Sequence, residues 1–321
     1  MRPLPAALRC SRESKRERHA GGATWSPLKI LHWVENRTRG QPTPVVDNVT
    51  GTIFMAFDDN LSGKTTGSTL ITSSQDDGQT WSNATAIPKA GGGVITSPNS
   101  GLGRGFVIYN ASLPSKTRLI LPTESGAMYS DDHGASWTLG PPPQGQAGVG
   151  ENSIARCTPG ACGGAPGGSA QFAMVHRGPA PKDPTKSAVG IHFSNDSIHW
   201  SAPRPLPGLS RYTNYSQAPG LIATPGGLLL SHGGLGPPPS ADGSLRAGHG
   251  DSNGADLFSS TDGVTWELAR HVWPFTCGYS AMVETSTDAS GGALTYALLF
   301  EAGGVVGAEQ MLALMNFTGK P

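Results

Sequence analysis

Short apolar runs separated by turns rich in glycine and proline dominate the chain. Clear examples are PVVDNVTGTIFMAF, GSTLITSS, TRLILP, AVGIHFS, GLLLSH and ALTYALLF. Runs of this length, rich in branched and aromatic residues, are typical of strands, and none of them carries an apolar stripe at helical spacing. The pattern therefore predicts an all-β protein.

Composition narrows this picture. The chain has 45 glycines and 27 prolines in 321 residues, which indicates many tight turns. All-β domains often exceed 200 residues, so we expect one large domain. Basic and acidic residues balance at 23 each, so no net field favours nucleic acid or an anionic membrane. No window of about 18 apolar residues occurs, and we expect no membrane span.

A motif that ends in tryptophan repeats along the chain. The stretch SSQDDGQTWS, residues 73–82, nearly recurs as YSDDHGASW. The copies at Trp81 and Trp137 are complete, those at Trp200 and Trp266 are one residue shorter, and the copy at Trp25 is broken by ESKRERHA. We expect a tight turn whose amides bond the Ser and Asp side chains while the tryptophan packs across the hairpin. The spacing of about 60 residues suits a four-stranded propeller blade.

The pattern Ser-x-Asp-x-Gly-x-Thr-Trp resembles the Asp-box, or BNR repeat, of sialidases (neuraminidases). Propellers of other function also carry Asp-boxes, so the stretches between them are more telling: GQPTPVVDNVTGTIFMAF, GLGRGFVIYNASLPSKTRLILP, QAPGLIATPGGLLLSH and CGYSAMVE follow the family's order. The resemblance implies a six-bladed β-propeller over residues 21–321, with its pocket on the central axis and an incomplete first blade. Residues 1–20 are then a basic segment, disordered or a remnant of that blade.

The resemblance also implies a site. Tyr279 in CGYSAMVE matches the family's nucleophile, and Glu151 in GENSIAR matches the base that withdraws the phenolic proton. A neutral nucleophile suits sialic acid, whose anomeric carbon carries a carboxylate. Arg177 in FAMVHRG matches the second of three arginines that bind this carboxylate. Taken singly, Tyr279 would be an ordinary strand tyrosine, Glu151 a loop carboxylate and Arg177 a surface arginine.

Two further residues match the family, and three expected ones do not. Glu301 in LLFEAG matches the acid that steadies the first arginine, and Gln217 in SQAPG matches a residue of the pocket floor; either could also be an ordinary polar residue near a strand end. No counterpart of the first arginine or of the acid/base aspartate precedes Trp25. The position of the third arginine is Gly254, with Arg246 as the alternative.

Two functions of different class follow. The first is an exo-α-sialidase that removes terminal sialic acids from glycoproteins, glycolipids or oligosaccharides with retention, without cofactor or metal. The second is a catalytically impaired propeller that binds glycans without hydrolysis. A propeller for protein interaction would explain the repeats but not the order of Glu151, Arg177 and Tyr279. Coding sequence upstream of Met1 that supplies the missing arginine and aspartate would favour the enzyme.

Glycosylation sequons and cysteines give information on the cellular compartment of the protein. Seven Asn-x-Ser/Thr sequons exceed the number expected by chance and predict the secretory pathway or an extracellular location, with a signal upstream of Met1. Four cysteines fit one or two disulfides, with Cys157 and Cys162 close enough to close a short loop, or free buried thiols. Their spacing is poor evidence for zinc. The sequons lie at Asn36, Asn48, Asn83, Asn110, Asn195, Asn214 and Asn316.

Overall fold

The structure is a computed structural model of the chain, and all of its described elements are strands. It divides into two compact units, Met1–Leu139 and Gly140–Pro321, and each is described by itself. None of the described residues forms a helix, so this part of the chain contains no apolar helix of membrane-spanning length. The structure describes residues 13–15, 18–19, 24–27, 29–61, 67–96, 99–101, 103–113, 115–163, 170–177, 189–206, 219–233, 253–286, 295–302 and 311–318.

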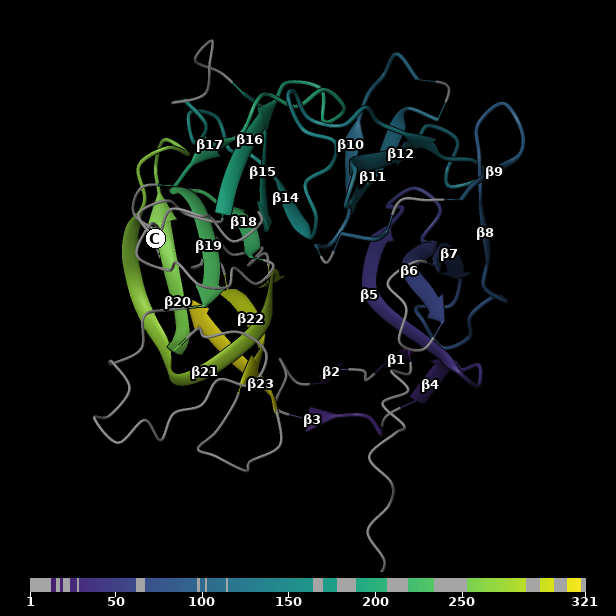
Figure 1. The fold of residues 1–321 in the computed structure, drawn as a ribbon, viewed down its shortest axis with the longest axis horizontal. Coiled ribbons are helices and arrows are strands. Elements are labelled where there is room, and N and C mark those ends of the chain that lie inside the picture. Colours follow the sequence, from purple (N-terminus) through teal and green to yellow (C-terminus); the bar gives the residue numbers. More distant parts are fainter. Residues whose placement is uncertain are drawn as a thin grey trace, which may run out of the picture. The chain divides into compact units, whose positions relative to one another are not determined.

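The first unit is built of antiparallel sheets, and in its two larger sheets each strand pairs with the next one along the chain (Figure 1). The five-stranded sheet contains β5 (Arg37–Val46), β6 (Ile53–Leu61), β7 (Gly67–Ser74), β8 (Thr85–Pro88) and β9 (Val94–Ile95). The four-stranded sheet contains β10 (Phe106–Tyr109), β11 (Thr117–Thr123), β12 (Gly126–Ser130) and β13 (Thr138–Leu139). Two short pairs join β1 (Glu13–Lys15) to β4 (Lys29–His32) and β2 (Arg18–His19) to β3 (Thr24–Trp25).

The second unit repeats the same meander. One sheet contains β14 (Asn152–Arg156), β15 (Phe172–Arg177), β16 (Val189–Ser194) and β17 (Arg204–Pro205). A six-stranded sheet contains β18 (Gly220–Thr224), β19 (Gly227–Gly233), β20 (Asn253–Ser260), β21 (Glu267–Ser286), β22 (Thr295–Ala302) and β23 (Met311–Thr318). The 20-residue β21 pairs with β20 up to Thr276 and with β22 from Cys277 onward, so one long strand serves two neighbours in succession (Figure 1).

The apolar runs noted in the sequence form the inner strands of these sheets and supply the core. Strands β11 and β16 are buried along almost their whole length. In β11 this burial accompanies a continuous apolar run, Leu119–Leu121, whereas β16 alternates Val189, Ile191 and Phe193 with smaller or polar residues that are also buried. In the first unit the core gathers around Leu119, Leu121 and Trp137. In the second unit one cluster surrounds Val175 and Ile191, and another is formed by residues of β18 to β22, among them Leu257 and Leu298. The prediction of an all-β protein is confirmed for the described residues.

The Asp-boxes have the predicted geometry. In the copy at Trp81, Ser74 Oγ donates to Asp76 Oδ1 at 2.8 Å and accepts the amide of Gly78 at 2.9 Å. Asp76 Oδ1 also accepts the amide of Thr80 at 2.8 Å, and the indole of Trp81 donates to the Gly78 carbonyl at 3.0 Å. Hydrogen bonds from the Thr80 hydroxyl and amide lower the pKa of Asp76 to about 2. The motif therefore closes a turn with bonds contained in eight residues.

The other described copies do not all keep the indole bond: Trp266 donates to the Gly263 carbonyl at 3.2 Å, whereas the indole nitrogens of Trp137 and Trp200 are buried and have no hydrogen-bond partner in the structure. The bonds of the serine and the aspartate are kept in every one of these copies, including the shorter ones. In each, the serine hydroxyl donates to the aspartate at 2.7 to 3.1 Å, in the pairs Ser130–Asp132, Ser194–Asp196 and Ser260–Asp262. The residue before the tryptophan still donates its amide, at 2.8 Å from His199 to Asp196 and at 2.7 Å from Thr265 to Asp262. A shorter turn thus preserves the same bonds. For the copy at Trp25, the structure describes only the pairing of β2 with β3.

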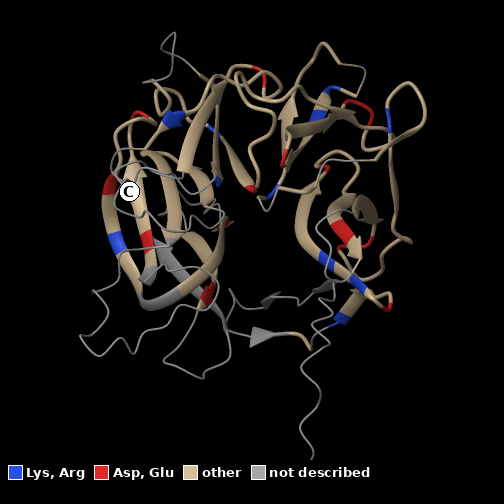
Figure 2. Ribbon diagram, viewed as in Figure 1, with Lys and Arg blue, Asp and Glu red and all other residues tan. Residues whose placement is uncertain are grey.

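Charged residues are dispersed over the described strands and turns of each unit rather than gathered on one element (Figure 2). Several are used in local ion pairs. Arg118 makes two hydrogen bonds of 2.7 Å to Asp131, and Arg39 lies 3.0 Å from Asp59. This dispersal agrees with the even charge balance of the sequence. It indicates that a functional site is formed by a local cluster of side chains.

Candidate active site

Three of the residues singled out in the sequence meet in the second unit. The phenolic hydroxyl of Tyr279 donates to Glu151 Oε1 at 2.8 Å. Arg177 donates from one guanidinium nitrogen to Glu151 Oε2 at 2.8 Å and to the Tyr279 oxygen at 3.3 Å. A tyrosine, a carboxylate and a guanidinium from distant parts of the chain thus form one hydrogen-bonded cluster.

The sheet pairing explains how Glu151 and Arg177 come together. Glu151 directly precedes β14, Arg177 ends β15, and the amide of Arg177 donates to the Glu151 carbonyl at 2.8 Å. Gly150 has a φ of 67°, and a β-carbon there would lie 3.1 Å from the Arg177 carbonyl oxygen. Glycine therefore permits the turn that directs Glu151 toward the arginine.

Tyr279 lies inside β21, where the pairing with β22 shifts register between Cys277 and Ser280. Such an irregularity redirects a side chain from the regular alternation of a strand. Glu301 of β22 stabilises this point, because its Oε2 accepts the backbone amide of Tyr279 at 3.2 Å. A β-carbon at Gly278 would collide with the Glu301 side chain, so only glycine allows this close approach.

Burial and neighbouring charges shift the pKa values of Tyr279 and Arg177 in this cluster. Glu151 is 8% exposed, whereas Tyr279 and Arg177 are half-buried. Burial, followed by the negative charge of Glu151, raises the pKa of Tyr279 to about 12, although Arg177 opposes the shift. Burial also disfavours the charge of Arg177, but the hydrogen bond and charge of Glu151 outweigh it and raise the arginine's pKa. At neutral pH the hydroxyl of Tyr279 is therefore protonated and donates its hydrogen bond to Glu151.

This arrangement can deliver a nucleophile. Attack by the phenolic oxygen requires loss of its proton, and Glu151 already accepts that proton in a hydrogen bond of 2.8 Å. The guanidinium of Arg177 has the planar donor geometry that binds a carboxylate. The cluster therefore combines a phenol, a carboxylate side chain that accepts its proton and a guanidinium.

One neighbour of the site was missed in the sequence. His176 is 7% exposed, and its Nδ1 lies 3.1 Å from the carbonyl of Val149, two residues before Glu151. Because a carbonyl only accepts, this nitrogen donates and ties the loop to β15. The only feature of the sequence that could have indicated this role is the position of His176 directly before Arg177. The matched Gln217 and the alternative Arg246 lie outside the described residues.

The second unit contains a disulfide and a free thiol. Cys157 and Cys162 form a disulfide, as expected from their short spacing, so for this pair the alternative of free thiols is wrong. Cys277 is a free buried thiol whose pKa is raised to about 12, first by burial and then by Glu301 and Asp256. Within the described ranges, no group of three or more potential metal ligands is present.

The chain is similar to known proteins in its repeats and in its fold. A family model described as a BNR repeat-like domain matches residues 12–162. No curated protein matches the sequence. The Hadza microbial sialidase Hz136 is 18% identical with a TM-score of 0.54, over 89% of this chain and 56% of that one. This chain thus spans little more than half the length of that sialidase.

Two further solved structures are similar at fold level. The intramolecular trans-sialidase from Ruminococcus gnavus, in complex with oseltamivir carboxylate, is 14% identical with a TM-score of 0.57, over 92% of this chain and 84% of that one. The Trypanosoma rangeli sialidase, in complex with 2,3-difluorosialic acid as a covalent intermediate, is 14% identical with a TM-score of 0.57, over 94% and 48%. The chain therefore resembles BNR-repeat proteins in sequence over residues 12–162, and it resembles solved sialidases in its fold.

Proposed function

We propose that the protein is a retaining exo-α-sialidase that acts on terminal sialic acids of glycoconjugates. One observation carries the proposal: Tyr279, Glu151 and Arg177 form a hydrogen-bonded cluster although the tyrosine is 128 residues from the glutamate along the chain. The antiparallel meanders are proposed to be blades of a six-bladed propeller over residues 21–321, with an incomplete first blade. Solved sialidases of similar fold support both parts.

The proposed first step forms a covalent intermediate. The phenolic oxygen of Tyr279 attacks the anomeric carbon of the sialoside while its proton passes to Glu151. The bond from that carbon to the leaving oxygen breaks, and the leaving alcohol takes up a proton from solvent. Water then attacks the same carbon and releases one proton to solvent, the tyrosyl oxygen leaves and regains its proton from Glu151, and two displacements give net retention.

Arg177 binds the substrate carboxylate in this proposal. Its side chain is 36% exposed, so a ligand can reach it while it keeps its bond to Glu151. The protonation of the leaving group is the most demanding step for the residues matched so far, because none of them is an evident acid. A 4-methylumbelliferyl leaving group needs little protonation, since phenols of this kind are far more acidic than sugar alcohols.

The test compares the release of 4-methylumbelliferone from its α-sialoside by the wild type, Tyr279→Phe and Tyr109→Phe. Tyr109 is 70% exposed and provides a matched control for loss of a phenol. We expect activity in the wild type and in Tyr109→Phe, and a loss of at least 100-fold in Tyr279→Phe. Treatment with 2,3-difluorosialic acid should also add one sialosyl mass to a peptide that contains Tyr279.

The outcomes separate the two functions drawn from the sequence. Turnover that Tyr279→Phe leaves unchanged would refute the proposed nucleophile. No turnover of the aryl sialoside, with retained binding of sialylated oligosaccharides, would replace the proposal by that of a glycan-binding module. Turnover of the aryl sialoside without that of sialyllactose would support Tyr279 and Glu151 and locate the defect in leaving-group protonation.

A further inference from the structure

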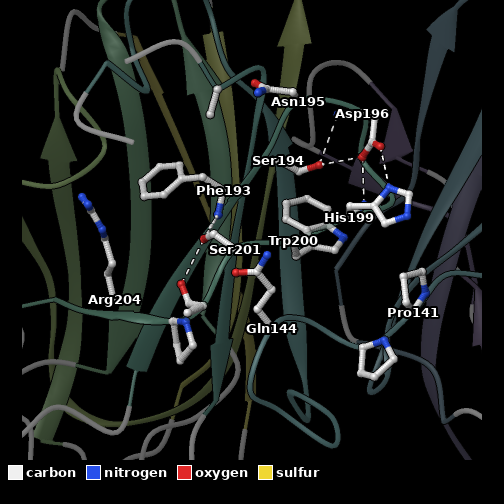
Figure 3. Close-up of a pocket in the computed structure, with 14 residues that line it drawn as sticks. Pro141, Gln144, Phe193, Ser194, Asn195, Asp196, His199, Trp200, Ser201 and Arg204 are labelled. Atoms are coloured by element: carbon white, nitrogen blue, oxygen red, sulfur yellow. Dashed lines mark hydrogen bonds and ion pairs between the residues drawn. The ribbon is translucent and has the colours of Figure 1, made fainter. Parts of the chain in front are cut away.

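A groove in the second unit lies outside the catalytic cluster. Its volume is about 680 Å³, and none of Glu151, Arg177 and Tyr279 lines it. Two buried aromatic residues, Phe193 and Trp200, contribute to its lining, with exposed fractions of 3% and 2%. Exposed residues of the rim include Pro141, Pro142, Gln144 and His199 (Figure 3).

The lining of this groove suits a neutral sugar. Proline rings and aromatic edges offer C–H surface, while the amide of Gln144 and the guanidinium of Arg204 offer hydrogen-bond donors. The one carboxylate in the lining, Asp196, is already engaged by the serine of its own turn at 3.0 Å and by the His199 ring at 2.7 Å. The carboxylate of the lining is therefore already paired, and the guanidinium of Arg204 is the other charged group that the lining offers.

Asn195 belongs to this lining and begins the sequon Asn195-Asp196-Ser197. It lies in the turn that follows β16, next to Ser194 and Phe193 in Figure 3, and it is exposed. The hydrogen bonds of the turn use Ser194, Asp196 and backbone amides. The Asn195 side chain contributes to none of these bonds and can be extended without breaking the turn.

We propose that Asn195 carries an N-linked glycan whose first sugars lie in this groove. In the modification, the amide nitrogen of Asn195 attacks the anomeric carbon of an oligosaccharide linked through pyrophosphate to a polyisoprenol. The carbon–nitrogen bond forms as the carbon–oxygen bond to pyrophosphate breaks, the amide loses one proton, and the lipid pyrophosphate leaves. The inference is independent of the proposed hydrolysis.

Two other observations support the compartment that this modification requires. Asn36, Asn48 and Asn83, which begin three of the other sequons, are also exposed. The disulfide between Cys157 and Cys162 is the form favoured in an oxidising compartment. Exposed sequons and a disulfide together point to synthesis in the secretory pathway.

The experiment uses the full chain secreted from eukaryotic cells and treated with peptide-N-glycosidase in ¹⁸O water, which converts each glycosylated Asn to labelled Asp. Peptide mass spectrometry should find the label at Asn195 and at Asn83. Under native conditions the Asn195 glycan should be released at least tenfold more slowly than the Asn83 glycan, because the groove shields it. After denaturation the two rates should become equal.

Two results would overturn the inference. An unlabelled Asn195 in the secreted chain would refute the modification, and equal native release rates at Asn195 and Asn83 would refute the place of the sugars in the groove. The variants Asn195→Gln and Asn83→Gln serve as a matched pair. Each should remove one glycan mass, and only Asn195→Gln should abolish the slow phase of native release.

Discussion

Substitution of Glu151 by glutamine is the most informative perturbation of the catalytic cluster. The amide keeps the size of the side chain but lacks the carboxylate that accepts the Tyr279 proton at 2.8 Å. Loss of a positioned general base lowers rates by about 10²- to 10⁴-fold, or roughly 3 to 5 kcal/mol of transition-state free energy. We therefore expect kcat for an aryl sialoside at pH 7 to fall by that factor in Glu151→Gln.

The same substitution should change the pH dependence. The pKa of Tyr279 is raised to about 12, first by burial and then by the charge and hydrogen bond of Glu151, against the opposing influence of Arg177. In Glu151→Gln the contribution of the carboxylate disappears while that of Arg177 stays, so the pKa of Tyr279 should fall. The variant's rate should then rise about tenfold per pH unit as the phenolate forms, up to that lower pKa.

The assay is the initial rate of 4-methylumbelliferone release between pH 5 and 10, together with absorbance titration of the phenol by difference against Tyr279→Phe. Glu267→Gln is the matched control, because Glu267 is exposed at the start of β21. A rate for Glu151→Gln within threefold of the wild type at pH 7 would refute the role of the base. So would an unchanged pKa of Tyr279.

The remaining predictions concern substrate binding, the turns and acid stability. Arg177→Lys replaces the planar donor pair by a single ammonium and should raise KM for the sialoside by roughly 10- to 100-fold, whereas Arg156→Lys, at an exposed position, should leave KM unchanged. Ser130→Ala removes the hydroxyl that donates to the aspartate of its Asp-box and accepts a turn amide, so the free energy of unfolding measured by urea titration should fall by about 1 to 2 kcal/mol. The control is Ser125→Ala, at a half-buried serine outside the Asp-box. Equal losses of unfolding free energy in the two variants would contradict the role of the turn bonds. Burial lowers the pKa of His192 from 6.5 to about 4, so the unfolded chain binds this proton at a higher pH than the folded chain does. The free energy of unfolding should therefore keep its full value above pH 6.5 and fall by up to about 3 kcal/mol as the pH is lowered to 4. His192→Gln should remove this decline from the measured free energy of unfolding if the histidine is responsible.

Features encoded by local sequence were predictable. The apolar runs mark inner strands because strands buried on both faces favour apolar residues at successive positions, as in Leu119–Leu121 of β11. The Asp-boxes are predictable because their bonds connect residues within eight positions, such as Ser74 to Gly78. The cluster of Tyr279, Glu151 and Arg177 was found through the order of family motifs, since nothing local links these residues.

Other features depend on tertiary structure and could not be derived. The cysteine spacing allowed a disulfide or free thiols, and only the folded loop distinguishes them. The bond from His176 to the Val149 carbonyl depends on the register between β14 and β15, which the sequence does not state. The groove beside Asn195 arises where a proline-rich loop meets the end of β16, so the sequon alone gave no indication of it.

The contrast between the turns and the catalytic cluster has a consequence for folding kinetics. Each Asp-box bond joins residues two to four positions apart, such as Asp76 with Thr80, so these turns can form within microseconds and nucleate their own hairpins. The contact between Tyr279 and Glu151 spans 128 residues, and that between Tyr279 and Arg177 spans 102. Under the proposed function, activity should therefore be the last property that the chain acquires during folding, since Tyr279 meets Glu151 only after the strands of the second unit have paired.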